Sequence, residues 1–188
     1  IKCLDPNLLI DTILPPDNIV GSVVYPACEI VKPGTIKHIA GNRFSLGEPE
    51  GSESDRLKLI SDILKRAGFR APIQKNIRDE IWLKLIGNLS FNPISALTGA
   101  TLEQICNDKG TEEIVRAMMT EAKIIAEELG AKINMSIEKR IEGARKVGAH
   151  KTSMLQDIEA GKPIEIDSII IAVKELGELT CSPTPYID

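Results

Sequence analysis

Short runs of β-branched and hydrophobic residues occupy the first part of the chain, separated by residues that favour turns. The hydrophobic positions of residues 55–67 instead recur with helical spacing, with Ser52 or Ser54 as N-cap and Gly68 just past the end. The segments that we expect to form strands are residues 19–25, 35–40, 43–46 and 71–74. This part of the sequence therefore predicts a mixed α/β segment.

From residue 76 onward the hydrophobic positions follow the period of about 3.6 residues that is typical of helices. Pro93 is expected to kink or break the first helix, and Gly130 and Gly161 are expected to end two later ones. The predicted helices are residues 76–97, 111–129, 135–147, 153–160 and 165–176. The pattern thus places a boundary between an α/β part and an all-α part near residue 75.

The first of these helices carries a line of polar residues in an otherwise hydrophobic sequence. Lys84, Asn88 and Asn92 follow one another at four-residue spacing, so they span roughly 80° of one helix face. Asparagine is a poor helix former, so the presence of two asparagines in one helix suggests that they have a role other than helix formation. The line is either the solvated face of a core helix or the wall of a cleft. In a cleft, the lysine would stabilise developing negative charge and the amides would orient a substrate.

Composition narrows the class of protein. Hydrophobic residues make up 43% and charged residues 27% of the 188 residues, which is typical of a soluble globular protein. The net charge is −4 and no basic stripe with interleaved aromatics is present, so we expect no nucleic-acid partner. No hydrophobic run is long enough for a membrane span and no signal peptide opens the chain. The four scattered cysteines favour free thiols and no metal site. These features predict a cytoplasmic protein.

Two separated motifs resemble those of the ketopantoate reductase family. Residues 77–93, IRDEIWLKLIGNLSFNP, are similar to the helix pattern of the family, in which W-x-K-L is followed by N-x-x-x-N-P, and residues 95–98 continue the similarity. Residues 152–157, TSMLQD, followed by IEID at 164–167, resemble its second signature. Their order along the chain is the order found in the family, which makes the resemblance specific.

The resemblance also implies a fold and a domain organisation. Residues 33–38 and 46–49 resemble the strands that close the nucleotide-binding domain of the family. Residues 1–75 would be the end of a Rossmann-type dinucleotide-binding domain. Residues 76–188 would be an all-α substrate-binding and catalytic domain like the C-terminal domain of the 6-phosphogluconate dehydrogenase superfamily. No G-x-G-x-x-G motif is present. We therefore expect this sequence to belong to a longer polypeptide and to bind NADPH poorly alone.

An activity and site residues follow from the same resemblance. It implies NADPH-dependent reduction of 2-dehydropantoate to (R)-pantoate, a step of pantothenate and coenzyme A biosynthesis. Lys84 matches the catalytic lysine, which would act as general acid. Asn88, Asn92 and Ser153 match substrate-binding positions, and Glu165 matches a position that contacts the nicotinamide nucleotide. The expected partner is a small 2-keto acid, with NADP as cofactor and no metal, nucleic acid or membrane, and a homodimer is left open.

Some of these residues also have purely local interpretations. Ser153-x-x-Gln156 has the form of a capping box, so Ser153 could begin a helix. Glu165 lies in a predicted first turn, where a carboxylate suits the helix dipole. His38 and His150 are expected to be structural, although His150 lies near Ser153 and stays a candidate pocket residue.

Two rival functions stay open. A β-hydroxyacid dehydrogenase would also place a lysine four residues before an asparagine, on a helix that follows a Rossmann domain, and another 2-keto acid reductase is the alternative beside it. The former usually has glycines just before that lysine, where this sequence has Glu80, Ile81 and Trp82. The chain could instead be a non-enzymatic helical dimerisation module, because the hydrophobic face of residues 111–129 could pack on a partner. Packing of that face within its own domain is the more ordinary interpretation.

Overall fold

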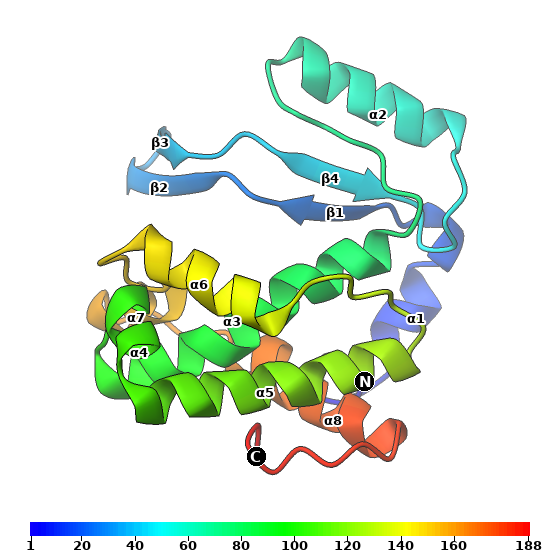
Figure 1. Cartoon of the computed structure of the whole chain (residues 1–188). Coiled ribbons are helices and arrows are strands. Elements are labelled where there is room, and N and C mark those ends of the chain that lie inside the picture. Colours follow the sequence, from blue (N-terminus) through cyan, green and yellow to red (C-terminus); the bar gives the residue numbers. More distant parts are fainter. The chain divides into compact units, whose positions relative to one another are not determined.

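The computed structural model describes residues 1–10 and 12–188, and their contacts divide the chain into two compact units. One unit, Asp11–Ile81, contains all the strands and is called the α/β unit; the other, Ile1–Ile10 with Trp82–Asp188, is the helical unit (Figure 1). The sequence placed residues 1–10 in the strand-containing part. They pack with the helical unit instead, because the backbone N–H groups of Lys2 and Cys3 donate to the Glu175 carboxylate at 2.6 and 2.8 Å.

Two antiparallel strand pairs form the sheets of the α/β unit. Strand β1 (Gly21–Val24) pairs with β4 (Phe44–Gly47), and β2 (Ala27–Lys32) pairs with β3 (Thr35–Ala40). The sequence predicted β1, β3 and β4 but missed β2. Every residue of β2 is exposed, so this strand lacks the alternation of buried and exposed positions that identifies half-buried strands.

The fourth expected strand, residues 71–74, forms only isolated bridges beside β4. The backbone N–H of Leu46 donates to the Pro72 carbonyl at 2.9 Å, and the N–H of Gln74 donates to the Leu46 carbonyl at 2.7 Å. Pro72 has no N–H of its own, so the ladder cannot extend regularly through it. The prediction of a regular strand here was wrong, although the segment does lie along the sheet.

Helix α2 (Asp55–Arg66) covers the small core of the α/β unit. Its N-cap is Ser54, one of the two predicted caps. The Ser54 hydroxyl accepts a hydrogen bond from the backbone N–H of Leu57 at 3.2 Å. Leu57 is fully buried with Leu46 and Ala71. Two short helices precede the strands: α1 (Leu9–Ile13) and the 3₁₀ turn η1 (Pro16–Asn18).

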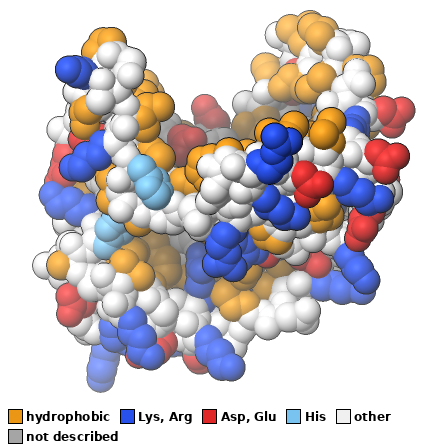
Figure 2. Space-filling model, turned by 90° about the horizontal axis from the view of Figure 1, so that it is seen from above, with side chains coloured by type: hydrophobic (Ala, Val, Ile, Leu, Met, Phe, Trp, Pro, Cys, Tyr) orange, Lys and Arg blue, Asp and Glu red, His pale blue; other side chains and the backbone are white. Residues whose placement is uncertain are grey.

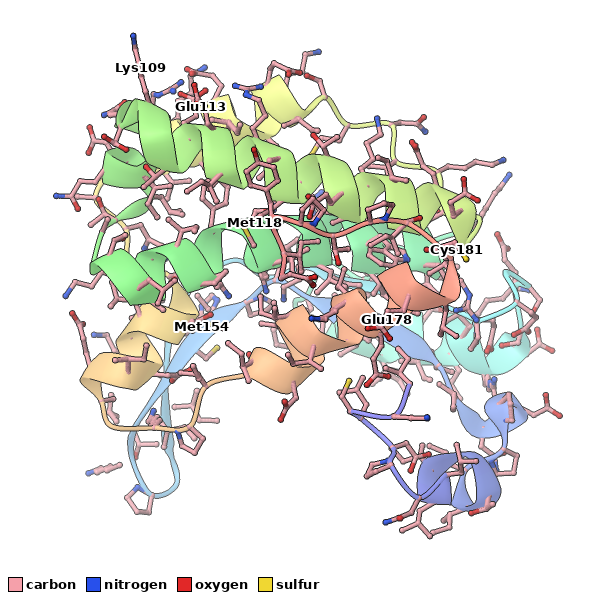
Figure 3. The ribbon with its side chains drawn as sticks, turned by 90° about the horizontal axis from the view of Figure 1, so that it is seen from below. Lys109, Glu113, Met118, Met154, Glu178 and Cys181 are labelled. Atoms are coloured by element: carbon pink, nitrogen blue, oxygen red, sulfur yellow. The ribbon has the colours of Figure 1, made fainter. Side chains whose placement is uncertain are left out.

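The helical unit is built from α-helices that follow one another closely along the chain (Figures 1 and 3). Its elements are α3 (Ile77–Thr98) from Trp82 onward, α4 (Leu102–Asn107), α5 (Lys109–Glu128), α6 (Ile137–Val147), α7 (Ser153–Glu159), the π-helical η2 (Asp167–Ile171) and α8 (Ala172–Leu179). Helix α4 escaped the sequence analysis because it is only one and a half turns long. It is fixed by a capping box between Thr101 and Gln104.

Hydrophobic faces of α3, α5 and α8 meet in one core. Trp82, Ile86 and Leu89 of α3 are buried there. The hydrophobic face of α5 is buried in the same core, and Met118 lies among the helices in Figure 3. That face therefore packs within its own unit, which removes the main basis for a stand-alone dimerisation module.

Helix α3 continues through Pro93 to Thr98, so of the kink or break expected there, the break does not occur. Pro93 lacks the N–H that would bond to the Leu89 carbonyl, which costs helix stability. Leu89 and Ile94 are buried on either side of it, and this packing holds the helix together.

The surface of the chain mixes charged and hydrophobic side chains (Figure 2). Among the exposed hydrophobic residues are Ile30 and Val31 of β2 and Ile36 and Ile39 of β3. None of the helices in the described part of the chain combines the length and the hydrophobicity that crossing a lipid bilayer requires. All four cysteines are free thiols.

Candidate active site

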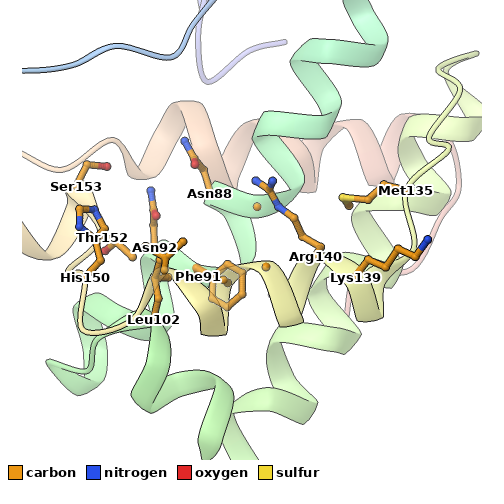
Figure 4. A pocket seen from close by; sticks show the side chains of 14 residues that line it. Asn88, Phe91, Asn92, Leu102, Met135, Lys139, Arg140, His150, Thr152 and Ser153 are labelled. Carbon is orange, nitrogen blue, oxygen red and sulfur yellow. The ribbon is translucent and has the colours of Figure 1, made fainter. Parts of the chain in front are cut away.

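A cavity of about 620 Å³ opens within the helical unit between α3, α6 and the start of α7 (Figure 4). The residues that line it come from three stretches of the chain. They are Gly87, Asn88, Phe91, Asn92 and Leu102 from the first stretch, Met135, Lys139, Arg140, Gly143, Ala144 and Val147 from the second, and His150, Thr152 and Ser153 from the third. The cavity thus joins polar side chains to a largely hydrophobic wall, as small-molecule sites commonly do.

Helix α3 supplies the two amides of the cavity. Asn88 and Asn92 are one turn apart and both face it, together with Phe91 (Figure 4). The side chain of Asn92 is only 5% exposed, yet neither amide has a hydrogen-bond partner among the described residues. Among the described residues, no side-chain nitrogen or oxygen atom is both fully buried and without a hydrogen-bond partner. The Asn92 amide is therefore accessible to solvent, and the cavity is the place where water or a ligand can contact it. Such a group is normally satisfied by water or a ligand.

Ser153 enters the cavity from the first position of α7, and it is not the N-cap of that helix. The cap is Thr152, whose hydroxyl accepts a hydrogen bond from the backbone N–H of Leu155 at 3.3 Å. The alternative interpretation, a capping box between Ser153 and Gln156, is therefore wrong. Thr152 has the extended backbone that a cap needs, and the Gln156 side chain donates to the Lys151 carbonyl at 2.9 Å instead.

The structure places the remaining expected site residues elsewhere. Lys84 is half-buried on α3, one turn before Asn88, but it is not among the residues that line the cavity. Glu165 is exposed just before η2, where its backbone carbonyl accepts a hydrogen bond from the Ser168 hydroxyl at 3.4 Å. The cavity therefore brings Asn88, Asn92 and Ser153 together, without Lys84 or Glu165.

The ionisable side chains of the cavity wall are all basic. Lys139, Arg140 and His150 line it, and none of the described residues that line it is an aspartate or glutamate. The cavity can thus take an anion beside a hydrophobic group. Sequence reasoning treated His150 mainly as structural and missed Lys139 and Arg140. The available signal was Gly87, a glycine inside a long helix, which often marks close approach by another group.

The geometry suits a small carboxylate ligand. Amides from one helix and a hydroxyl from another offer donors and acceptors, while Phe91 and Val147 offer hydrophobic contact. Lys139 is exposed and Arg140 is half-buried, so the two cationic side chains of the wall differ in their access to solvent. A fold that holds such groups on helices rather than on loops fixes their positions well.

The chain is similar to known proteins over most or all of its length. The family model described as "Ketopantoate reductase PanE/ApbA C terminal" matches residues 76–188. A 2-dehydropantoate 2-reductase of Mesorhizobium japonicum is 52% identical over the whole chain, and one of Archaeoglobus fulgidus is 26% identical over 85% of it. The chain spans 58% and 54% of the lengths of these two relatives.

Solved structures of proteins with these names have a similar fold. The crystal structure of 2-dehydropantoate 2-reductase from Methylococcus capsulatus superposes with a TM-score of 0.88 at 31% identity, covering 97% of this chain and 59% of that one. A structure from Ralstonia solanacearum MolK2, assigned to a ketopantoate reductase, has a TM-score of 0.94 at 42% identity, covering 100% and 57%. The α/β unit and the helical unit that follows it along the chain thus share their fold with more than half the length of these two structures. The chain belongs to the ketopantoate reductase family.

Proposed function

We propose that this chain carries the substrate-binding and catalytic helices of a 2-dehydropantoate 2-reductase. The enzyme would reduce 2-dehydropantoate to (R)-pantoate with NADPH, in pantothenate and coenzyme A biosynthesis. The observation that carries this proposal is that Asn88, Asn92 and Ser153, which match the substrate-binding positions of the family, border one cavity. The names of the relatives at 52% and 31% identity support the same activity.

The fold assignment is part of the proposal. Residues 1–75 would be the end of a Rossmann-type domain, and residues 76–188 a helical domain like that of the 6-phosphogluconate dehydrogenase superfamily. The 188 residues contain no G-x-G-x-x-G motif, so they do not by themselves fit the pyrophosphate of a dinucleotide. NADP as cofactor rests on the family resemblance. Glu165 is the residue of this chain that we propose to contact it.

Lys84 is the proposed general acid. Reduction of a ketone leaves negative charge on its oxygen, and an ammonium group beside that oxygen both stabilises the charge and donates the proton that completes the hydroxyl. Asn88 and Asn92 would hold the substrate by hydrogen bonds from their amides, which fixes the ketone relative to the lysine. The Ser153 hydroxyl would bind a polar group of the substrate. Lys84 lies one helical turn from Asn88, so both can reach one small molecule.

Steady-state kinetics of the full-length enzyme test this proposal. Wild type is assayed with NADPH and 2-dehydropantoate or other 2-keto acids, and in the oxidative direction with NADP⁺ and 3-hydroxy acids. Lys84→Ala should lower kcat/KM by about 100-fold or more, as loss of a general acid does. Lys146→Ala, which removes an exposed lysine of α6 outside the cavity, is the matched control. A change of only a few-fold in Lys84→Ala for every 2-keto acid would refute the role of the lysine.

The same assay separates the rival reactions. A higher kcat/KM for 3-hydroxy acids than for 2-dehydropantoate would indicate a β-hydroxyacid dehydrogenase. A clear preference for another 2-keto acid would keep the chemistry and change the substrate. D-mandelate dehydrogenase structures superpose with TM-scores of 0.81 and 0.84 at 21% identity, which shows a shared fold and no more.

A further inference from the structure

Arg140 lies directly against the backbone of α3 at Gly87. A Cβ atom built on Gly87 would come within 3.1 Å of both Cζ and Nε of Arg140, and closer still to Nη2. Real Cβ atoms almost never approach other atoms so closely, so only glycine lets the guanidinium lie where it does. Figure 4 shows this guanidinium beside α3, next to Asn88. The cation is thus set into the cavity wall between the two helices.

Arg145 and Glu138, two other charged residues of α6, bond to neighbouring helices instead. Arg145 donates to the Cys106 carbonyl at 2.6 Å and forms an ion pair with Glu112 at 3.2 Å, which ties α6 to the helices beside it. Glu138 pairs with Arg116 at 2.9 Å. Neither Arg145 nor Glu138 lines the cavity. Of the two arginines described on α6, Arg140 lines the cavity and Arg145 does not.

We propose that Arg140 binds the carboxylate of the 2-keto acid substrate and that Gly87 makes room for it. This inference rests on the proposed function and identifies the residue that makes the site select acids. Arginine suits the task because its planar guanidinium can donate two parallel hydrogen bonds to one carboxylate. Lys139, the neighbouring cation, is exposed and is less able to hold an anion in one geometry.

The position along α3 fits the chemistry. Gly87 lies three residues after Lys84 and one before Asn88, so the guanidinium lies over the turn that connects them. In a 2-keto acid the carboxylate is bonded directly to the ketone carbon. A carboxylate held at Gly87 therefore leaves the ketone within the reach of the same helical turn. The orientation of the substrate would follow from this one contact.

The test uses the full-length enzyme with NADPH and compares 2-dehydropantoate with its neutral methyl ester. Arg140→Gln should raise KM for the acid by about 10- to 100-fold, the loss expected for a hydrogen-bonded charge, and should change KM for the ester little. The KM of Arg140→Lys for the acid should lie between those of wild type and Arg140→Gln. Lys146→Gln removes an exposed charge from the same helix outside the cavity and should leave both KM values unchanged. Calorimetric titration of pantoate should show the same loss of affinity in Arg140→Gln.

Gly87→Ala provides an independent arm, because its Cβ displaces the guanidinium without removing it. It should raise KM for the acid as Arg140→Gln does, while the melting temperature stays equal or rises, since alanine favours a helix interior. The double variant should be no worse than the poorer single variant, because both remove one interaction. An unchanged acid-to-ester preference in Arg140→Gln and Arg140→Lys, in an enzyme that reduces the acid, would overturn this inference alone. Absence of wild-type turnover would overturn the proposed function.

Discussion

The hydroxyl of Thr152 caps α7 by accepting a hydrogen bond from the backbone N–H of Leu155 at 3.3 Å, which releases the neighbouring hydroxyl of Ser153 from the helix. Thr152 is buried and Ser153 is exposed at the cavity. Two adjacent hydroxyl residues, which look interchangeable in the sequence, therefore have separable roles. One stabilises the helix and the other is available to a ligand.

Alanine substitutions should separate these two roles. Thr152→Ala should lower the free energy of unfolding by about 1 kcal/mol, because one backbone N–H of the first turn loses its acceptor. Ser153→Ala should leave stability nearly unchanged and raise KM for the keto acid about threefold to tenfold, the loss of one hydrogen bond. Urea denaturation and steady-state kinetics measure the two effects. A larger loss of stability in Ser153→Ala than in Thr152→Ala would contradict the capping assignment.

The Asn92 side chain should contribute to activity at some cost to the stability of the folded state. Its amide is nearly buried and has no hydrogen-bond partner among the described residues, so it costs the folded state free energy unless water or substrate pairs with it. Asn92→Leu, which keeps the number and branching of the heavy side-chain atoms, should leave the free energy of unfolding equal or up to about 1 kcal/mol higher. The same change should lower kcat/KM by about 10- to 100-fold.

Ser90→Ala on the same helix is the control for Asn92. The Ser90 hydroxyl is buried and donates to the Ile86 carbonyl at 2.9 Å, away from the cavity. Its loss should affect stability slightly and kinetics hardly at all. If Asn92→Leu destabilised the protein by more than about 2 kcal/mol, the amide would have a structural role that its surroundings do not reveal.

Local signals in the sequence predicted most elements, whereas the shape of the cavity depends on contacts between distant segments. The Ser54 cap and the long hydrophobic periods of α3 and α5 are local, so the sequence located these helices within two residues at each end. The fully exposed β2 has no such period. In the sequence, Arg140 has no feature that distinguishes it from a surface arginine. Its contact with Gly87, 53 positions earlier in the chain, exists only in the folded structure. Likewise, only the backbone conformation decides between Thr152 and Ser153 as the cap.

Acid should weaken the α/β unit through Glu48. Its side chain is buried and accepts hydrogen bonds from Arg56 Nη2 at 2.5 Å, from Arg56 Nε at 2.9 Å and from the Ser54 hydroxyl. The hydrogen bonds from Arg56, followed by that from Ser54, lower the pKa of Glu48 from its ordinary value of 4.5 to about 2. The unfolded chain therefore takes up this proton at a higher pH than the folded chain. The stabilisation is complete above about pH 4.5 and is lost as the pH falls toward 2.

Glu48→Gln should remove this pH dependence. The variant is less stable than wild type at pH 7, because the charged pair with Arg56 is gone, and the difference should shrink between pH 4.5 and 2. Hydrogen exchange of the Leu57 amide in α2, measured over this range, reports on the α/β unit directly. Asp55→Asn is the control, since the Asp55 carboxylate is fully exposed with only a 3.6 Å contact to Lys58. Parallel pH profiles of wild type and Glu48→Gln would contradict the role of Glu48.

Glu121 should hold the C-terminal segment on the helical unit. Its nearly buried carboxylate on α5 accepts hydrogen bonds from the backbone N–H groups of Tyr186 at 3.0 Å and Ile187 at 3.1 Å. Glu121→Ala leaves both donors without their acceptor and should lower the free energy of unfolding by about 3 kcal/mol. Glu121→Gln, which keeps an acceptor oxygen, should lose less.

The amides of Tyr186 and Ile187 report on this interaction directly. Their hydrogen exchange should speed up in Glu121→Ala more than the exchange of amides in the middle of α5, because the segment opens locally before the unit unfolds. Glu127→Ala, on the exposed face of the same helix, loses only a 3.7 Å pair with Lys123 and should change stability by less than about 0.5 kcal/mol. Unchanged protection of the two amides in Glu121→Ala would show that hydrophobic packing, with Ile187 buried in the core, suffices to hold the segment.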